Sequence, residues 1–519
     1  MARLVVLGLD GFSHLLLKTG ACRYLKGIYE EGPSGPLEST IPISTPSAWA
    51  SFQTGLCVGN HGVSGFLRFN GIRKTVPRDS RDIGAITFYE LLDTSGLRCF
   101  IMNMPYTYPP KIKGDLVFSW LSGISDITRA VRPSTLLDRF PSLRKCRMFP
   151  EHGTTERAAL MNMLEYTRAQ IEVVREVVAS GRYDFMFFML PVTDWIQHMM
   201  LPLRMLQGRG SDEVEVAETI LAEVDGLVEF LDAQLSPDDA LIIMSDHGFR
   251  YCEKTFSIND WLAQEGYIRL SFTGEDVLDR AGHAIVRGRP AKRRVRLGLL
   301  ANLFIGSPLA RLLRPFAGGL ASTVLRVGEA LGMSIVSGCR VDEARSLAFC
   351  LEHSEFGIYV NRKLDPGRRA ALRAKLVEEL NALEGIRALD TTRLYGGCEM
   401  VDYLPDIYLL PGRWAIVKGM AGVPVLDMPM MVHDLYGILV MRGEAFEGQP
   451  KRPRIVDLAP TILYLMGLPP PEGLDGRPLL ECLREDLLAR RIRKLGRRRD
   501  LRSRARRLAM GVGHVEGTS

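Results

Sequence analysis

The chain has 519 residues and a net charge of +6, with 46% hydrophobic and 24% charged residues. This composition is typical of a globular protein and excludes an extensively disordered chain. The longest apolar runs fall short of the about 18 residues that a membrane-spanning helix needs, so no transmembrane segment is expected. The length allows one large α/β domain with an insertion, or two to three smaller domains.

The cysteines and the N-terminus both bear on the compartment. Nine cysteines are scattered along the chain without a Cys-x-x-Cys pair, which indicates reduced thiols rather than a disulfide framework or a cysteine metal site. Residues 1–10 lack the long apolar region and small-residue cleavage site of a signal peptide and predict a buried first strand instead. We therefore expect a cytoplasmic protein.

The positive charge is concentrated near the C-terminus. Residues 484–507 contain twelve Lys or Arg and three acidic residues, a net charge of +9, which leaves −3 for the rest of the chain. Such a tail suits peripheral contact with anionic lipid or nucleic acid, and the alternative is a solvated terminal helix. A nucleic-acid-binding surface over the whole protein is not indicated.

Strand-like apolar runs alternate with amphipathic helical stretches over most of the chain. The clearest strands are 4–9, 99–102, 185–190, 241–244, 346–349, 357–360 and 438–441, and the clearest helices are 156–179 and 212–235. This alternation predicts an α/β fold with a mostly parallel central sheet and helices on both faces.

One stretch breaks the alternation. Residues 272–341 are basic and rich in Leu and Gly, which predicts a helical cap inserted into one domain that is formed by residues 1–271 and 342–482. The alternative for this stretch is an amphipathic element that lies on a membrane surface. Residues 483–519 form the arginine-rich C-terminal tail.

The first polar motifs lie near the N-terminus. Asp10 ends the first predicted strand and precedes Gly11, so its carboxylate lies at a strand tip and can bind a metal ion. Residues 44–55, STPSAWASFQTG, place Ser44 and Thr45 before Pro46 at the start of a helical stretch. Backbone N–H groups and the positive dipole end favour a phosphoryl group there, and the alternative is a simple helix cap.

The later motifs combine carboxylate and imidazole. Asp194 and His198 are one helical turn apart, Asp246 and His247 follow a buried strand, and His433 precedes another strand. Together these ligand types suit zinc or manganese. Because open α/β sheets place their sites at strand ends, the pattern predicts a two-metal phosphoryl-transfer enzyme.

These motifs occur in the order LGLDGF, STPSAWASFQTG, TDWIQH, MSDHGF and VHDLYG. In this order they resemble the alkaline phosphatase superfamily, specifically the type I phosphodiesterase/nucleotide pyrophosphatase family, from Leu4 to about Leu480. The resemblance implies an alkaline phosphatase-like three-layer fold with an inserted cap. It implies a hydrolase, in which residues 1–271 and 342–482 form the catalytic domain, and a small phosphodiester or pyrophosphate as substrate.

The resemblance also implies a role for each motif residue. One metal ion is expected on Asp10, Thr45, Asp246 and His247, and a second on Asp194, His198 and His433. Zn²⁺ is the expected ion and Mn²⁺ a substitute. Thr45 is the expected nucleophile, which would form a phosphothreonine.

Three alternative functions compete with this prediction. A sulfatase is disfavoured because Ala48 stands where the Ser-x-Pro-x-Arg site of sulfatases has its Arg. A phosphoglycerate mutase-like phosphotransferase of the same superfamily would use serine, which here means Ser44 as nucleophile. A non-enzymatic adaptor would use the basic cap and tail, but all seven ligand positions carry residues able to bind metal.

Overall fold

The computed structural model describes residues 3–69, 75–151, 153–272, 339–351, 354–419 and 422–486, together with Ala489. The chain divides into two compact units, Met1–Arg250 with His433–Ser519, and Tyr251–Val432. A search of the described residues finds no helix that is both long and apolar enough to cross a membrane.

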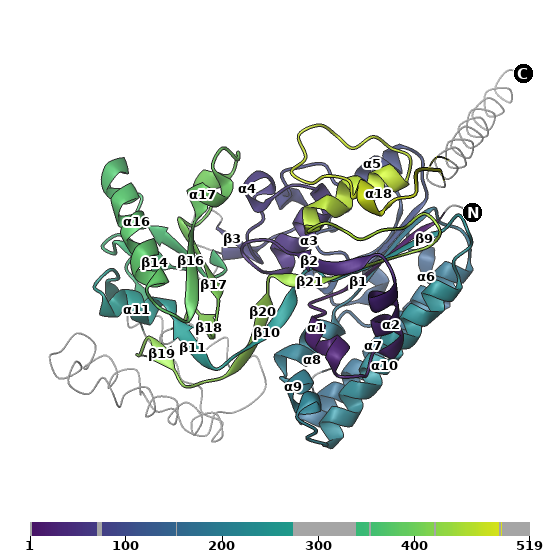
Figure 1. The fold of residues 1–519 in the computed structure, drawn as a ribbon, viewed down its shortest axis with the longest axis horizontal. Helices are drawn as coiled ribbons and strands as arrows, with labels where there is room; N and C mark the ends of the chain where they lie inside the picture. Colours follow the sequence, from purple (N-terminus) through teal and green to yellow (C-terminus); the bar gives the residue numbers. More distant parts are fainter. Residues whose placement is uncertain are drawn as a thin grey trace, which may run out of the picture. The chain divides into compact units, whose positions relative to one another are not determined.

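The first unit is built on an eight-stranded sheet with the strand order β2-β21-β9-β1-β8-β5-β6-β7 (Figure 1). The strands are β1 (Leu4–Leu9), β2 (Ser34–Glu38), β5 (Cys99–Met102), β6 (Asp115–Val117), β7 (Val131–Arg132), β8 (Phe185–Leu190), β9 (Ala240–Met244) and β21 (Tyr436–Arg442). The five strands from β9 to β6 are parallel, whereas β21 and β7 run antiparallel to their inner neighbours. The predicted mostly parallel sheet is confirmed.

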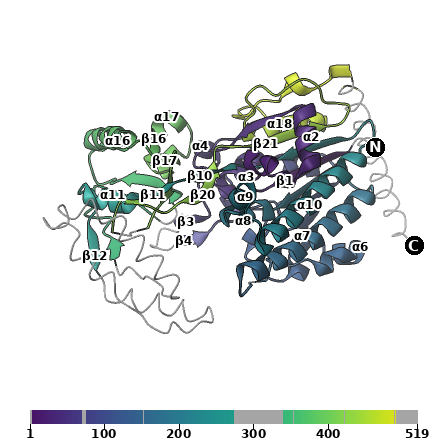
Figure 2. The same cartoon turned by 60° about the horizontal axis from the view of Figure 1, so that its bottom comes forward.

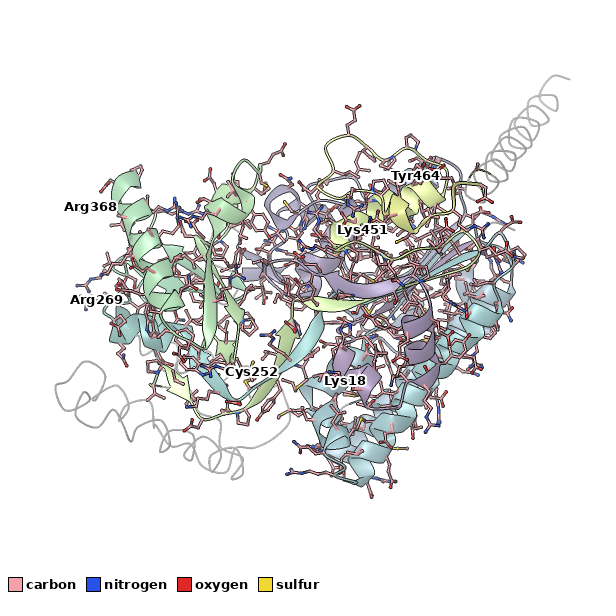
Figure 3. All side chains as sticks on the ribbon, viewed as in Figure 1. Lys18, Cys252, Arg269, Arg368, Lys451 and Tyr464 are labelled. Atoms are coloured by element: carbon pink, nitrogen blue, oxygen red, sulfur yellow. The ribbon has the colours of Figure 1, made fainter. Side chains whose placement is uncertain are left out.

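Helices cover both faces of this sheet (Figure 2). On β1, Val5, Leu7 and Leu9 pack into a core shared with α2, α7 and α10, while Leu4 and Val6 pack into a second core shared with α3, α5 and α18. The helices are α2 (Arg23–Glu31), α3 (Thr45–Thr54), α5 (Phe88–Thr94), α7 (Glu156–Ala179), α10 (Asp212–Ala233) and α18 (Leu458–Leu465). Side chains fill the space between the layers (Figure 3). The three-layer α/β fold is therefore as predicted.

Local sequence explains where the functional helix begins and ends. Pro46 lies in the first turn of α3, where its missing N–H costs no helical hydrogen bond. All ten residues of α3 are buried, and Gly55 ends the helix with a φ of 71°. Only glycine adopts this left-handed conformation without a steric penalty.

The second unit has its own sheets and core. Strands β14 (Ala348–Cys350), β15 (Gly357–Val360), β17 (Ile407–Pro411) and β16 (Ile386–Asp390) form an antiparallel sheet in that order. This sheet shares a core with α11 (Ile258–Gln264) and α16 (Pro366–Asn381), where Arg368 extends outward (Figure 3). The expectation that the apolar runs 346–349 and 357–360 extend the parallel sheet is wrong. An apolar run shows that a strand is buried, but not which sheet it joins.

The predicted cap and tail fall largely outside the described residues. Strands β12 (Leu270–Phe272) and β13 (Cys339–Val341) pair antiparallel, so the chain leaves and re-enters the described part of the second unit at adjacent positions. Residues 273–338, which make up nearly all of the predicted cap 272–341, lie outside the description, as do most residues of the tail 483–519. The cap boundaries differ from those of the second unit, which spans 251–432. The cap and the tail stay predictions.

The packing of the sheet predicts a large stability effect at its centre. Phe187 of β8 is fully buried, and its ring centroid lies 5.5 Å from those of Trp49 and Phe52 on α3. We expect Phe187→Ala to lower the free energy of unfolding by about 3–5 kcal/mol, measured by urea denaturation. The matched variant Phe149→Ala, at a ring that is half exposed, should cost less than about 1 kcal/mol. Equal losses would contradict this packing account.

Candidate metal centre

The seven predicted site residues lie at one edge of the sheet. Asp10 follows β1, Asp194 lies in α8 (Val192–His198) directly after β8, and Asp246 follows β9. The register aligns Leu9 with Leu190 and Gly8 with Met244, so these three parallel strands end side by side. This carboxyl edge is where open α/β sheets bind their ligands.

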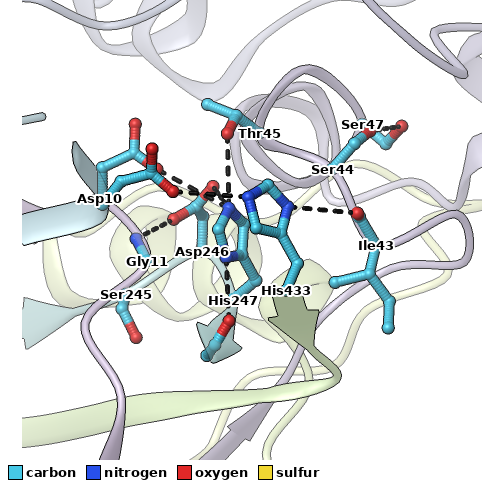
Figure 4. A network of polar contacts seen from close by, with 12 residues as sticks. Asp10, Gly11, Ile43, Ser44, Thr45, Ser47, Ser245, Asp246, His247 and His433 are labelled. Carbon is cyan, nitrogen blue, oxygen red and sulfur yellow. Dashed lines mark hydrogen bonds and ion pairs between the residues drawn. The ribbon is translucent and has the colours of Figure 1, made fainter. Parts of the chain in front are cut away.

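The other site residues reach the same edge from different elements. Because β21 is antiparallel to β9, its first residues lie at the carboxyl edge. His433 lies just before it, in β20 (Met430–Asp434). Thr45 is the first residue of α3, and its hydroxyl faces His247 (Figure 4).

The first group of potential ligands is Asp10, Asp246 and His247, with ligand atoms within 4.8 Å of one another. His247 Nε2 lies 3.7 Å from Asp10 Oδ1 and 3.4 Å from Asp246 Oδ2. Thr45 Oγ1 lies 3.3 Å from the same nitrogen. All four side chains are buried, so the hydroxyl belongs to an enclosed cluster of carboxylate and imidazole groups.

The second group is Asp194, His198 and His433. Asp194 Oδ1 lies 3.5 Å from His198 Nε2 and 3.3 Å from His433 Nε2, and the two nitrogens are 3.1 Å apart. The rings of His433 and His247 stack with centroids 3.7 Å apart. The two groups are therefore adjacent.

Backbone carbonyls orient two of the imidazoles. His247 Nδ1 lies 3.1 Å from the carbonyl of Gly248, and His433 Nδ1 lies 3.4 Å from that of Ile43. A carbonyl oxygen only accepts hydrogen bonds, so each Nδ1 carries the hydrogen, and Nε2 is the ring atom that can bind a metal ion. This is the arrangement found for histidines that bind metal ions.

Burial and charge shift the pKa values of the first group. Burial, and then the neighbouring Asp246 carboxylate, hold the pKa of Asp10 well above its usual value, and burial raises the pKa of Asp246 to about 7. Burial also holds the pKa of His247 well below its usual value, so its ring stays neutral. Two enclosed acids and a neutral imidazole lack a positive charge of their own, which a bound cation would supply.

In the second group, carboxylate and imidazole compensate each other. Burial acts to raise the pKa of Asp194, but the imidazoles of His198 and His433, whose Nε2 atoms lie 3.5 and 3.3 Å from its Oδ1, outweigh burial and the pKa is lowered. Burial acts to lower the pKa of His198, and the Asp194 carboxylate outweighs it and raises the pKa. Asp194 is thus ionised, as a metal ligand must be.

Three carboxylate oxygens of the site have the surroundings expected of metal ligands. Asp10 Oδ1, Asp194 Oδ1 and Asp246 Oδ2 are buried and have no hydrogen-bond partner among the described residues. Buried polar atoms without a partner are rare and costly, unless a ligand satisfies them. These atoms belong to the two ligand groups, and carboxylate with imidazole is a donor set suited to zinc or manganese. The residues of both groups therefore fit divalent cations.

The hydroxyls of Ser44 and Thr45 have different surroundings, although both are buried. Ser44 Oγ hydrogen-bonds to Ser47 Oγ at 2.9 Å, whereas Thr45 Oγ1 contacts His247 (Figure 4). Of the two hydroxyls, only that of Thr45 therefore contacts the first group of potential ligands among the described residues.

Sequence reasoning missed the residues that support the ligands. Phe249 packs its ring against those of His198, His247 and His433, with centroids 4.8, 5.8 and 5.0 Å apart. Gln197 hydrogen-bonds to the turn after β1. Both lie within two residues of a predicted ligand, but their residue types carry no metal chemistry.

The family can now be assigned from comparison with known proteins. Residues 4–299 match the model of the type I phosphodiesterase/nucleotide pyrophosphatase family, which is more than half of the chain. The chain belongs to this family. As a type I phosphodiesterase/nucleotide pyrophosphatase, it is a phosphoric ester hydrolase, and the predicted family and enzyme class are confirmed.

One solved structure, with a TM-score of 0.50, supports the fold of this type I phosphodiesterase/nucleotide pyrophosphatase, and a second similarity has a lower score. Phosphonoacetate hydrolase from Sinorhizobium meliloti 1021, solved with phosphonoformate, is 15% identical with a TM-score of 0.50, and the match covers 88% of this chain and 94% of that chain. Murine ectonucleotide pyrophosphatase/phosphodiesterase 5 is 13% identical with a TM-score of 0.46, over 90% of this chain and 96% of that chain. A comparison with curated proteins found no match.

Proposed function

We propose that this family member hydrolyses small phosphodiesters or pyrophosphates with two divalent metal ions and with Thr45 as the nucleophile. The proposal is carried by one observation: the Thr45 hydroxyl lies 3.3 Å from His247 Nε2, within a buried cluster in which Asp10 Oδ1 and Asp246 Oδ2 lack hydrogen-bond partners among the described residues.

Seven side chains would hold the ions. Asp10, Thr45, Asp246 and His247 would bind one, and the second group, Asp194, His198 and His433, would bind the other. Zn²⁺ suits this donor set, with Mn²⁺ as a substitute. When bound, such ions supply positive charge that activates a hydroxyl and stabilises a leaving oxygen.

The reaction itself proceeds through Thr45. Its Oγ1 forms a bond to phosphorus while the bond to the leaving oxygen breaks, and the hydroxyl proton ends on the departing alcohol or phosphate. Water then attacks the phosphothreonine, the bond between Oγ1 and phosphorus breaks, and the hydroxyl is restored. Thr45 begins α3, so the positive end of the helix dipole and first-turn N–H groups favour the charged phosphoryl group.

A diester should be a better substrate than a monoester. A monoester carries an additional negative charge and needs additional cationic contacts, whereas the described ion pairs of the site side chains all join Asp to His. We expect kcat/KM for bis-p-nitrophenyl phosphate to exceed that for p-nitrophenyl phosphate by about tenfold or more, or over 1.4 kcal/mol, in metal-reconstituted protein. A larger value for the monoester would contradict the diesterase proposal.

Neither alternative gains support. A mutase-like phosphotransferase would need Ser44, whose hydroxyl bonds to Ser47. Offering phosphoglycerate as the substrate tests the mutase-like alternative directly. A contact of the basic cap or tail with lipid or nucleic acid concerns residues outside the described ranges and stays a prediction, as does the cytoplasmic location.

A further inference from the structure

Two side chains of helix α8 hydrogen-bond to the turn after β1. Thr193 Oγ1 donates a hydrogen bond to the carbonyl of Asp10 at 2.6 Å, and Gln197 Nε2 donates one to the carbonyl of Gly11 at 2.7 Å. Gly11 has a φ of 64°, and a Cβ there would lie 2.7 Å from the ring of Phe249 and 3.0 Å from Asp194 Oδ1. The turn therefore passes directly against a ligand of the second group.

The amide of Gln197 is fully used. Its Nε2 also donates to the carbonyl of Thr193 at 2.8 Å, and its Oε1 accepts a hydrogen bond from the hydroxyl of Ser13. The side chain is completely buried. With both N–H groups and the oxygen engaged, the amide has one orientation and stiffens both segments that it joins.

Those two segments carry different ligand groups. Asp10 and Gly11 belong to the turn, and Gly11 N donates to Asp246 Oδ1 at 3.0 Å, so the turn orients two carboxylates of the first group. Helix α8 carries Asp194 and His198 of the second group, and Gln197 directly precedes His198.

We infer that Gln197 is a positioning residue that fixes the two metal-ligand groups relative to each other. The inference rests on the proposed function, because it requires that both groups bind ions. Gln197 is not itself a ligand, since its oxygen accepts the Ser13 hydroxyl. It acts by holding Asp10 and Asp246 at a fixed distance from Asp194 and His198.

The test compares metal binding by the full-length wild-type protein and by the full-length variant Gln197→Met. Methionine keeps the approximate shape of the glutamine side chain but lacks its amide. Metal-stripped proteins are titrated with Co²⁺ while the visible absorption spectrum is recorded, and with Zn²⁺ in competition with a chromophoric chelator. We expect a 10–100-fold weaker affinity for at least one ion and an altered cobalt spectrum, since groups that orient ligands have effects of this size. In the metal-loaded protein kcat should fall while KM stays unchanged.

Two further variants make the outcome decisive. Gln170→Met removes another buried glutamine, on α7 and outside both ligand groups, and should keep the affinities and spectrum of the wild type. Ser13→Ala removes only the hydroxyl that binds Gln197 Oε1, and should weaken metal binding in the same direction but less. If Gln197→Met does not fold, the same measurements on Ser13→Ala decide the question.

A purely structural role predicts a different result. The Tm of metal-free Gln197→Met would fall, while its Zn²⁺ affinities and cobalt spectrum would match the wild type, and this would overturn the inference. Unchanged metal binding in Ser13→Ala would overturn it when that variant is the one that folds. If wild-type protein binds fewer than two ions, the proposed function fails first and this inference fails with it.

Discussion

Replacing Thr45 with alanine is expected to lower kcat by roughly 10³-fold or more, about 4 kcal/mol of transition-state stabilisation. The change removes the hydroxyl that contacts His247 while leaving the six Asp and His ligands in place. Steady-state kinetics with bis-p-nitrophenyl phosphate measures the loss. Metal content is measured in parallel, so that a lost nucleophile is distinguished from a lost ion.

Two matched variants decide between the neighbouring hydroxyls. Thr45→Ser keeps a hydroxyl at the same position and should retain measurable activity. Ser44→Ala should cost far less than Thr45→Ala, because the Ser44 hydroxyl bonds to Ser47. The opposite ranking, with Ser44→Ala inactive and Thr45→Ala active, would move the nucleophile by one residue and favour the mutase-like alternative.

Replacing Asp246 with alanine is expected to reduce the bound divalent ions from two per chain to one and to abolish turnover. Asp246 is fully enclosed and supplies one of the unpartnered oxygens of the first group, so its loss leaves Asp10 and His247 as the only Asp and His ligands there. Elemental analysis of reconstituted protein gives the ion count, and a panel of diester substrates gives the activity.

The control for this variant is a buried aspartate at the other end of the sheet. Asp184 directly precedes β8 and accepts a hydrogen bond from Arg98 N at 3.0 Å, and it is as buried as Asp246. Asp184→Ala should lose stability but keep two ions. One ion or none in the wild-type protein would contradict the two-metal proposal itself.

Much of the catalytic fold could be predicted because its signals are local. The all-apolar run 4–9 and the amphipathic stretch 156–179 match β1 and α7 residue for residue. Since parallel strands end at a common edge, the polar residues that follow them had to converge there, and Asp10, Asp194 and Asp246 do.

The remainder depends on contacts that sequence patterns do not encode. Strands β14 and β15 have the same apolar character as the central strands, but they pair antiparallel in the second unit, because partner choice is set by packing. Gln197 was missed for a related reason. The amide of Gln197, within TDWIQH, has no distinctive chemistry in the sequence. Its role becomes visible only in the structure, where it hydrogen-bonds to the carbonyl of Gly11 and to the hydroxyl of Ser13.

The stereochemical course at phosphorus shows whether a covalent phosphothreonine forms on Thr45. A phosphorothioate diester chiral at phosphorus is hydrolysed in ¹⁸O-labelled water, and the configuration of the thiophosphate product is determined. Attack by Thr45 and then by water are two in-line displacements, and each inverts the centre, so we expect net retention. Net inversion would show a single displacement by water and would contradict Thr45 as the nucleophile.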